Sequence, residues 1–67
     1  MVTVTINGEP TEIASEMTVE VLLDTVEVPP NYLAVEVNSE VVRREDYATK
    51  MVHDGDRVEV VTLVGGG

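Results

Sequence analysis

Residues 2–13 read VTVTINGEPTEI, and this stretch decides how the chain begins to fold. Valine alternates with threonine as far as Ile6, and this period of two is typical of a strand with one apolar face. Asn7-Gly8 follows at once and favours a type I′ hairpin turn, in which both central residues have positive φ. The rest of the stretch is therefore predicted to be a second strand. Pro10 places that strand at a sheet edge, because proline has no N–H to donate to a neighbour.

Beyond the hairpin, a short amphipathic helix is predicted from Thr18 to about Thr25. Thr18 suits the N-cap position, and Glu20 suits the positive end of the helix dipole. Pro29 and Pro30 prevent the helix from continuing. Four apolar side chains have the i, i+3, i+4, i+7 spacing of a single helix face: Val19, Leu22, Leu23 and Val26.

Three more strands are predicted over residues 33–37, 40–43 and 57–64, and residues 44–48 are predicted to form a polar loop or one helical turn. The element order is then hairpin, helix, two strands, polar crossing and strand. This order indicates a two-layer α+β fold, in which a mixed sheet of four to five strands carries one main helix on one face. We expect a single domain over residues 1–64, followed by a flexible glycine tail over residues 65–67.

Size and charge exclude several classes of function. A chain of 67 residues buries only ~60% of the surface that it exposes when unfolded, which is too little for a deep enclosed active site. It has no cysteine, so disulfides and thiolate metal sites are excluded. Thirteen acidic and four basic residues give a net charge of −9, which argues against nucleic acids and anionic membranes as partners and favours proteins with basic surfaces.

Neither a membrane-spanning segment nor a secretory signal is expected. No apolar run approaches the length that crosses a bilayer, and the first residues lack a basic start followed by an apolar block. We therefore expect a cytoplasmic protein, monomeric when it is free.

The chain ends in three glycines, Gly65, Gly66 and Gly67, directly after the last predicted strand. They have two interpretations. One is a fraying terminus or a leftover linker. The other is a thin arm whose terminal carboxylate, on Gly67, is the reacting group. Glycine suits such an arm because a backbone without Cβ atoms can thread a narrow channel and reach a nucleotide bound by a partner.

The last predicted strand also indicates a docking surface. If Val58 and Val60 face the core, then Val61 and Leu63 face outward. Ala34 is expected on the same outer face, as is Val42 by its alternation with Glu40. We expect Ala34, Val42, Val61 and Leu63 to form an exposed apolar patch that binds a partner, because such patches mark interaction sites. The alternative is that the strand twists or bulges and buries some of them.

Other polar residues are less informative. His53 beside Asp54 and Asp56 is expected to be a solvated turn, with a metal or acid–base site as the weaker alternative, and no metal is predicted. Arg43 to Asp46 is expected to be a solvated loop with local charge pairing. Tyr47 is expected to cover one edge of the core with its hydroxyl in water. Neither a nucleophile–base pair nor a phosphate-binding loop is present, so an enzyme acting alone is not expected.

Taken in order, five blocks of the sequence resemble the sulfur-carrier proteins of thiamine biosynthesis, the ThiS family, whose fold is the ubiquitin-like β-grasp. The resemblance extends over nearly the whole chain and ends in the glycine tail. The blocks are residues 4–9, 18–23, 33–38, 40–43 and 54–61.

The resemblance implies a protein co-substrate, with no bound cofactor of its own, rather than an enzyme. It implies that an adenylating enzyme of the ubiquitin-activating type uses ATP to adenylate the carboxylate of Gly67. A persulfide from a sulfur donor such as a cysteine desulfurase then gives a thiocarboxylate, which a thiazole synthase consumes. Gly65 and Gly66 would supply the reach.

Two alternatives stay open. The small subunit of molybdopterin synthase, or another thiocarboxylate carrier, has the same tail chemistry. A passive β-grasp binding module with an incidental tail would tolerate extra residues after Gly67.

Overall fold

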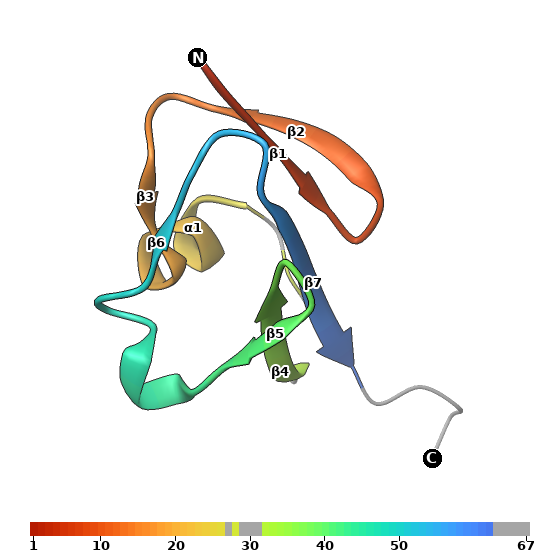
Figure 1. The fold of residues 1–67 in the computed structure, drawn as a ribbon, viewed down its shortest axis with the longest axis vertical. Helices are drawn as coiled ribbons and strands as arrows, with labels where there is room; N and C mark the ends of the chain where they lie inside the picture. The colour runs from red at the N-terminus through yellow and green to blue at the C-terminus, as the bar shows by residue number, and fades with distance from the viewer. Residues whose placement is uncertain (27, 29–31, 63–67) are drawn as a thin grey trace.

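The structure is a computed structural model that describes residues 1–26, 28 and 32–62, apart from the side chain of Leu33. One five-stranded sheet has a short helix and a two-stranded ladder on one side (Figure 1). The elements in chain order are β1 (Val2–Ile6), β2 (Glu9–Ile13), β3 (Met17–Thr18), α1 (Val19–Thr25), β4 (Tyr32–Val37), β5 (Glu40–Val42), the 3₁₀ turn η1 (Arg44–Asp46), β6 (Met51–Val52) and β7 (Arg57–Thr62).

The five-stranded sheet has the order β2-β1-β7-β4-β5, so the last of the described strands is its central strand. β1 and β7 are parallel, and the other neighbours are antiparallel. The sheet is therefore mixed, as the sequence predicted. β2 lies at one edge, where Pro10 needs no ladder partner on its outer side.

Both hairpins turn through residues with positive φ. Asn7 and Gly8 have φ of 50° and 84°, and Asn38 and Ser39 have φ of 53° and 70°. Paired positive φ values are the mark of the type I′ turn, whose twist matches that of the flanking strands. The hairpin predicted from Asn7-Gly8 is thereby confirmed, and the second turn fixes the register between β4 and β5.

α1 begins and ends close to where the sequence predicts. The Thr18 hydroxyl accepts a hydrogen bond from the Val21 N–H at 3.3 Å, which caps the first turn. Val19 and Leu22 are fully buried, and Leu23 and Val26 pack partly against the core. Val21, at the margin of the apolar face, is 46% exposed.

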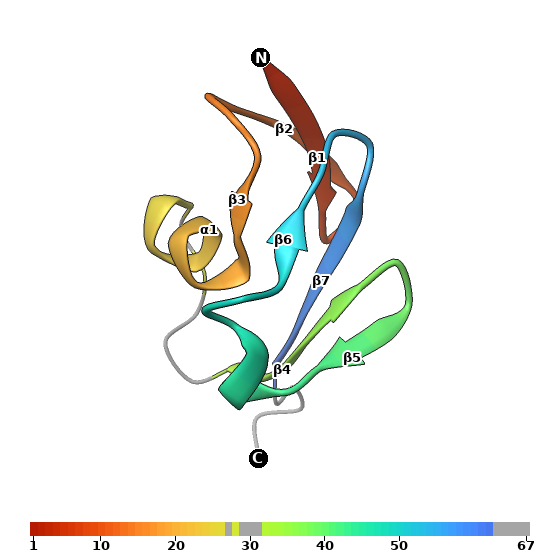
Figure 2. The same ribbon diagram turned by 60° about the vertical axis from the view of Figure 1, so that its left-hand side comes forward.

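The core lies between the five-stranded sheet and a layer formed by α1 and the β3–β6 ladder, which Figure 2 shows on one side of the sheet. The sequence did not predict β3 or β6. Two-residue strands are too short to show a periodicity, and their pairing of Met17 with Val52 becomes visible only in the fold. The buried core side chains are Val4, Ile13, Val19, Leu22, Val35, Val37, Val42, Tyr47, Val52, Val58 and Val60.

Tyr47 is more deeply buried than the sequence indicated. It is 7% exposed, and its hydroxyl has no hydrogen-bond partner among the described residues. The expectation that this hydroxyl lies in water is wrong, because Tyr47 packs into the core cluster and its hydroxyl oxygen is enclosed by protein. Burial raises the pKa of the Tyr47 phenol above its ordinary value. Its ring stacks on Tyr32, with centroids 6.4 Å apart.

The two arginines beside η1 behave differently. Arg43 forms the predicted local pair with Glu45, at 2.9 Å between Nη2 and Oε1. Arg44 instead donates to the carbonyl oxygen of Tyr32 at 3.2 Å, and its guanidinium lies 5.0 Å from the centre of the Tyr32 ring. Arg44 thus ties η1 to the start of β4.

No helix in residues 1–26, 28 and 32–62 has the length and apolar character needed to cross a membrane.

Candidate functional site

The face of the sheet that points away from α1 carries the candidate docking surface. Along β7, Val58 and Val60 are buried in the core, as predicted, so Glu59 and Val61 project from the opposite face. On β4, Ala34 pairs with Val61, which confirms its predicted position on this outer face. We call the side chains around this point the outer patch: half-buried Ala34 and Glu36, and exposed Val41, Glu59 and Val61.

The prediction that Val42 faces outward is wrong. Val42 is 8% exposed and pairs with buried Val35, whereas Val41 pairs with Glu36 and is 65% exposed. The reason is the two-residue turn at Asn38-Ser39, which pairs the last residue of β4 with the first residue of β5. Glu40 is exposed because it lies at the end of an edge strand, not because its side of the strand is the outer one.

Val41 is therefore the patch residue that the sequence analysis missed. The sequence contained the information needed. A two-residue hairpin loop at Asn38-Ser39 pairs Val37 with Glu40, and the next pair outward is then Glu36 with Val41. The alternation of polar and apolar residues gave the wrong face for Val42. In a three-residue edge strand even a residue on the inward side can be exposed to water, as Glu40 is.

The outer patch lies on the strand that leads to the glycines. β7 ends at Thr62, at the opposite end of the molecule from the N-terminus (Figure 1). Leu63 and the tail, including the predicted reacting residue Gly67, lie outside the described residues. Five residues follow Thr62, and an extended chain of that length spans at most about 17 Å.

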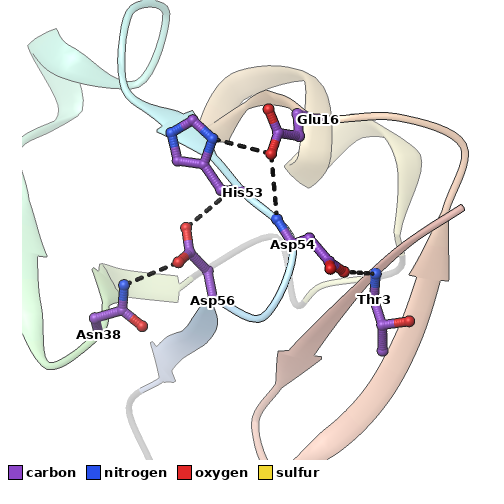
Figure 3. Close-up of polar contacts among 6 residues, drawn as sticks. All are labelled: Thr3, Glu16, Asn38, His53, Asp54 and Asp56. Atoms are coloured by element: carbon purple, nitrogen blue, oxygen red, sulfur yellow. Dashed lines mark hydrogen bonds and ion pairs between the residues drawn. The ribbon is translucent and has the colours of Figure 1, made fainter.

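The His53 turn does not form a metal site. The His53 Nδ1 atom lies 3.1 Å from Glu16 Oε2, while Asp54 accepts the N–H of Thr3 at 2.8 Å (Figure 3). Asp56 points another way and accepts from the N–H of His53 at 2.8 Å. Each carboxylate thus satisfies a backbone donor, and within the described part of the chain no group of three or more His, Asp or Glu side chains is arranged to hold a metal ion.

This turn ties together segments that are distant in the sequence. Asp56 also accepts from the amide of Asn38 at 3.0 Å, and Asn38 in turn accepts from the N–H of Arg57 at 3.0 Å. Burial alone would raise the pKa of the Asp56 carboxyl, but hydrogen bonds from His53 and Asn38 outweigh it and lower that pKa below 3.8. The role of the turn is structural: it holds the start of β7 against the β4–β5 hairpin.

Asp56→Asn should therefore destabilise the fold at neutral pH by about 1 kcal/mol. Asp56 accepts from the Asn38 amide and the His53 N–H, and one of these donors would then face an NH₂ group that cannot accept its hydrogen bond. The lowered pKa means that the carboxylate stabilises the fold above the ordinary Asp pKa, and that this contribution is lost as pH falls through the lower folded-state pKa. Urea unfolding at neutral and acidic pH checks this. The difference in free energy of unfolding between Asp56→Asn and the native chain should shrink towards zero in acid. Asp24→Asn, at an exposed helix position, is the control, and an equal loss there would contradict the assignment.

Comparison with known proteins shows which protein family has this architecture. Residues 4–67 match the model of the ThiS family, a span that includes the three glycines. The chain belongs to the ThiS family. A crystal structure of the thiamine biosynthesis protein ThiS from Geobacter metallireducens superposes with a TM-score of 0.83 at 38% identity, over 97% of this chain and 99% of that one. The solution structure of a Geobacter metallireducens thiamine biosynthesis protein gives a TM-score of 0.75 at the same identity. The α+β fold is thus the ThiS-like β-grasp that the sequence predicted.

Two curated relatives extend the comparison. The uncharacterized protein ycf40 of Porphyra purpurea is 30% identical over 66 residues, which cover 98% of this chain and 93% of that protein. A thiazole synthase of Paramagnetospirillum magneticum is 45% identical over 62 residues, 92% of this chain. The chain spans only 19% of the length of that synthase, so the similarity is to one part of it. Members of the ThiS family are thiamine biosynthesis proteins and typically sulfur carriers rather than enzymes.

Proposed function

We propose that this protein carries sulfur as a thiocarboxylate on Gly67 and delivers it for formation of the thiazole ring of thiamine. The observation that carries the proposal is that the family match continues through the three glycines to Gly67. Two alternative sites are set aside: the sequence has no cysteine, and the polar turn at His53 serves to satisfy backbone donors.

The chemistry begins with activation of the carboxylate. Its oxygen attacks the α-phosphorus of ATP in an adenylating enzyme, pyrophosphate leaves, and an acyl-adenylate forms. A sulfur nucleophile then attacks the carbonyl carbon and AMP departs. With a persulfide donor, a thiol must afterwards cleave the sulfur–sulfur bond to release the thiocarboxylate. The adenylate has to be kept from water, and glycines let a thin arm enter a closed channel.

The similarity to part of a thiazole synthase supports that enzyme class as the acceptor of the sulfur. A carrier-like segment within a synthase polypeptide places the sulfur donor beside the enzyme that uses it. This observation favours thiazole formation over molybdopterin synthesis for the present chain.

The test is intact-protein mass spectrometry after incubation with the adenylating enzyme, ATP and inorganic sulfide. Sulfide attacks the acyl-adenylate directly, so no reductant is needed. The native chain should gain the mass difference between sulfur and oxygen, and fragmentation should place that gain on Gly67. No gain in mass, or sulfur on any other residue, would overturn the proposal.

The outer patch is proposed to dock the adenylating enzyme, so Val61→Asp should weaken that binding about tenfold or more while the fold persists. Val61 is 37% exposed beside the root of the tail, and a charge there opposes burial against an apolar partner surface. Isothermal titration calorimetry measures the dissociation constant, and circular dichroism checks the fold. Val21→Asp, an exposed valine on α1, is the matched control. Equal binding by the native chain and Val61→Asp would reject the docking role.

A further inference from the structure

The outer patch places two acidic side chains opposite one another. Glu36 on β4 is the direct register partner of Glu59 on β7. Directly opposed residues in antiparallel strands have Cβ atoms about 4.5–5.5 Å apart, and like charges in this position repel. The fold cannot separate them by a one-residue slip, because that would turn the core residues of both strands outward. The neighbouring pairs that prevent such a slip are buried valines: Val35 with Val60 and Val37 with Val58.

Within residues 1–26, 28 and 32–62, neither Glu36 nor Glu59 forms an ion pair. The basic side chains of the protein are four, and two of them, Arg43 and Arg44, are engaged near η1. Arg57 shares the outer face with Glu59, but in the part of the chain that the structure describes it forms no ion pair with a carboxylate. It lines a shallow hollow of about 330 Å³ beside Gly8, on the side of Glu59 away from Glu36.

Exposed valines flank the two glutamates. Val41 is the neighbour of Glu36 across the β4–β5 pair, and Val61 follows Glu59 by two residues on the same face. A partner that covers both valines therefore also removes Glu36 and Glu59 from water. Covering a carboxylate without giving it a counter-charge is strongly unfavourable. A partner that gains from the valines must for this reason bring a cation to the glutamates.

We propose that the outer patch binds a surface of the adenylating enzyme in which an arginine or lysine side chain projects from an apolar area and lies between Glu36 and Glu59. This inference rests on the proposed function, and it adds the chemistry of the contact. The cation relieves a repulsion that is present in the free chain, so association and stability make opposite demands on the same pair. Apolar surfaces without a suitably placed cation are rejected, which gives the patch its specificity.

The experiment compares Glu36→Gln, Glu59→Gln and the matched control Glu12→Gln. Glu12 lies on the same outer face, opposite Thr3 and away from the patch. Each patch variant should bind the adenylating enzyme about tenfold more weakly than the native chain at low salt. The ratio of the two dissociation constants should fall as salt is added, because salt screens the charges. The free variants should be as stable as the native chain or melt higher, by up to about 5 °C. Glu12→Gln should bind like the native chain.

The outcomes separate this inference from the proposed function. If the native chain gains sulfur on Gly67 and both patch variants bind the enzyme as tightly as it does, the inference is overturned and the proposed function stands. If either patch variant melts several degrees lower, the pair is held favourably within the chain and the inference is again overturned. If the native chain neither binds the enzyme nor gains sulfur, the result contradicts both the proposed function and this inference.

Discussion

A chain extended by a few residues beyond Gly67 should gain no sulfur at all under conditions that convert the native chain completely. The extension moves the carboxylate past the nucleotide, so no acyl-adenylate can form at the Gly67 carbonyl. A bulky residue at Gly66, as in Gly66→Phe, should block conversion nearly as fully, because its side chain cannot enter a channel shaped for a bare backbone. Mass spectrometry of the intact chains reads both results directly.

The control for these tail variants is their fold and their docking. Residues beyond Thr62 follow the end of β7, so thermal unfolding of the core should be unchanged. Binding to the adenylating enzyme through the outer patch should persist in the extended chain. Full conversion of the extended chain would instead contradict the requirement for Gly67 as the free terminus, because sulfur would then be gained without that carboxylate.

Leu22→Ala should cost about 2–5 kcal/mol of the free energy of unfolding, a large share of what a domain of this size has. Leu22 is fully buried on α1, between the helix and the sheet, and its truncation leaves a cavity that the surrounding valines cannot fill. Urea unfolding followed by circular dichroism measures the loss, since the chain has no tryptophan to report it by fluorescence.

Val21→Ala is the matched control for the helix. Val21 precedes Leu22 but is 46% exposed, so its truncation should change stability by no more than about 0.5 kcal/mol. A similar loss in the two variants would mean that helix propensity, and not burial, governs the effect. A negligible loss for Leu22→Ala would contradict the core described above.

The sequence was most informative where local chemistry and long-range packing agree. Asn7-Gly8 requires positive φ and has it, and the spacing of Val19 and Leu22 places both in the core. The alternation along β7 likewise separates buried Val58 from exposed Glu59. In these cases a backbone requirement or a periodicity over several residues leaves a single solution.

The incorrect or missing predictions concern short strands and the segment that connects β5 to β6. Val42 was placed on the outer face because alternation was followed along β5 without counting the register across the turn. The β3–β6 ladder was missed because its strands have two residues each. The depth of Tyr47 was missed because it depends on how the segment after η1 packs against the core, which no local pattern encodes. The candidate site was predicted as a surface, but its composition depended on that register.

The central position of β7 has a consequence for how the protein is made. β7 follows the other described strands in the sequence, yet it pairs with both β1, the first of them, and β4, near the middle of the sequence. Until it emerges, the β1–β2 and β4–β5 hairpins have no strand to join them. Pairings so distant in sequence make folding slow relative to a helical domain of equal size. Synthesis must therefore pass Thr62 before the sheet can close, and a chain that stops before Arg57 should be cleared by proteases as two unjoined hairpins.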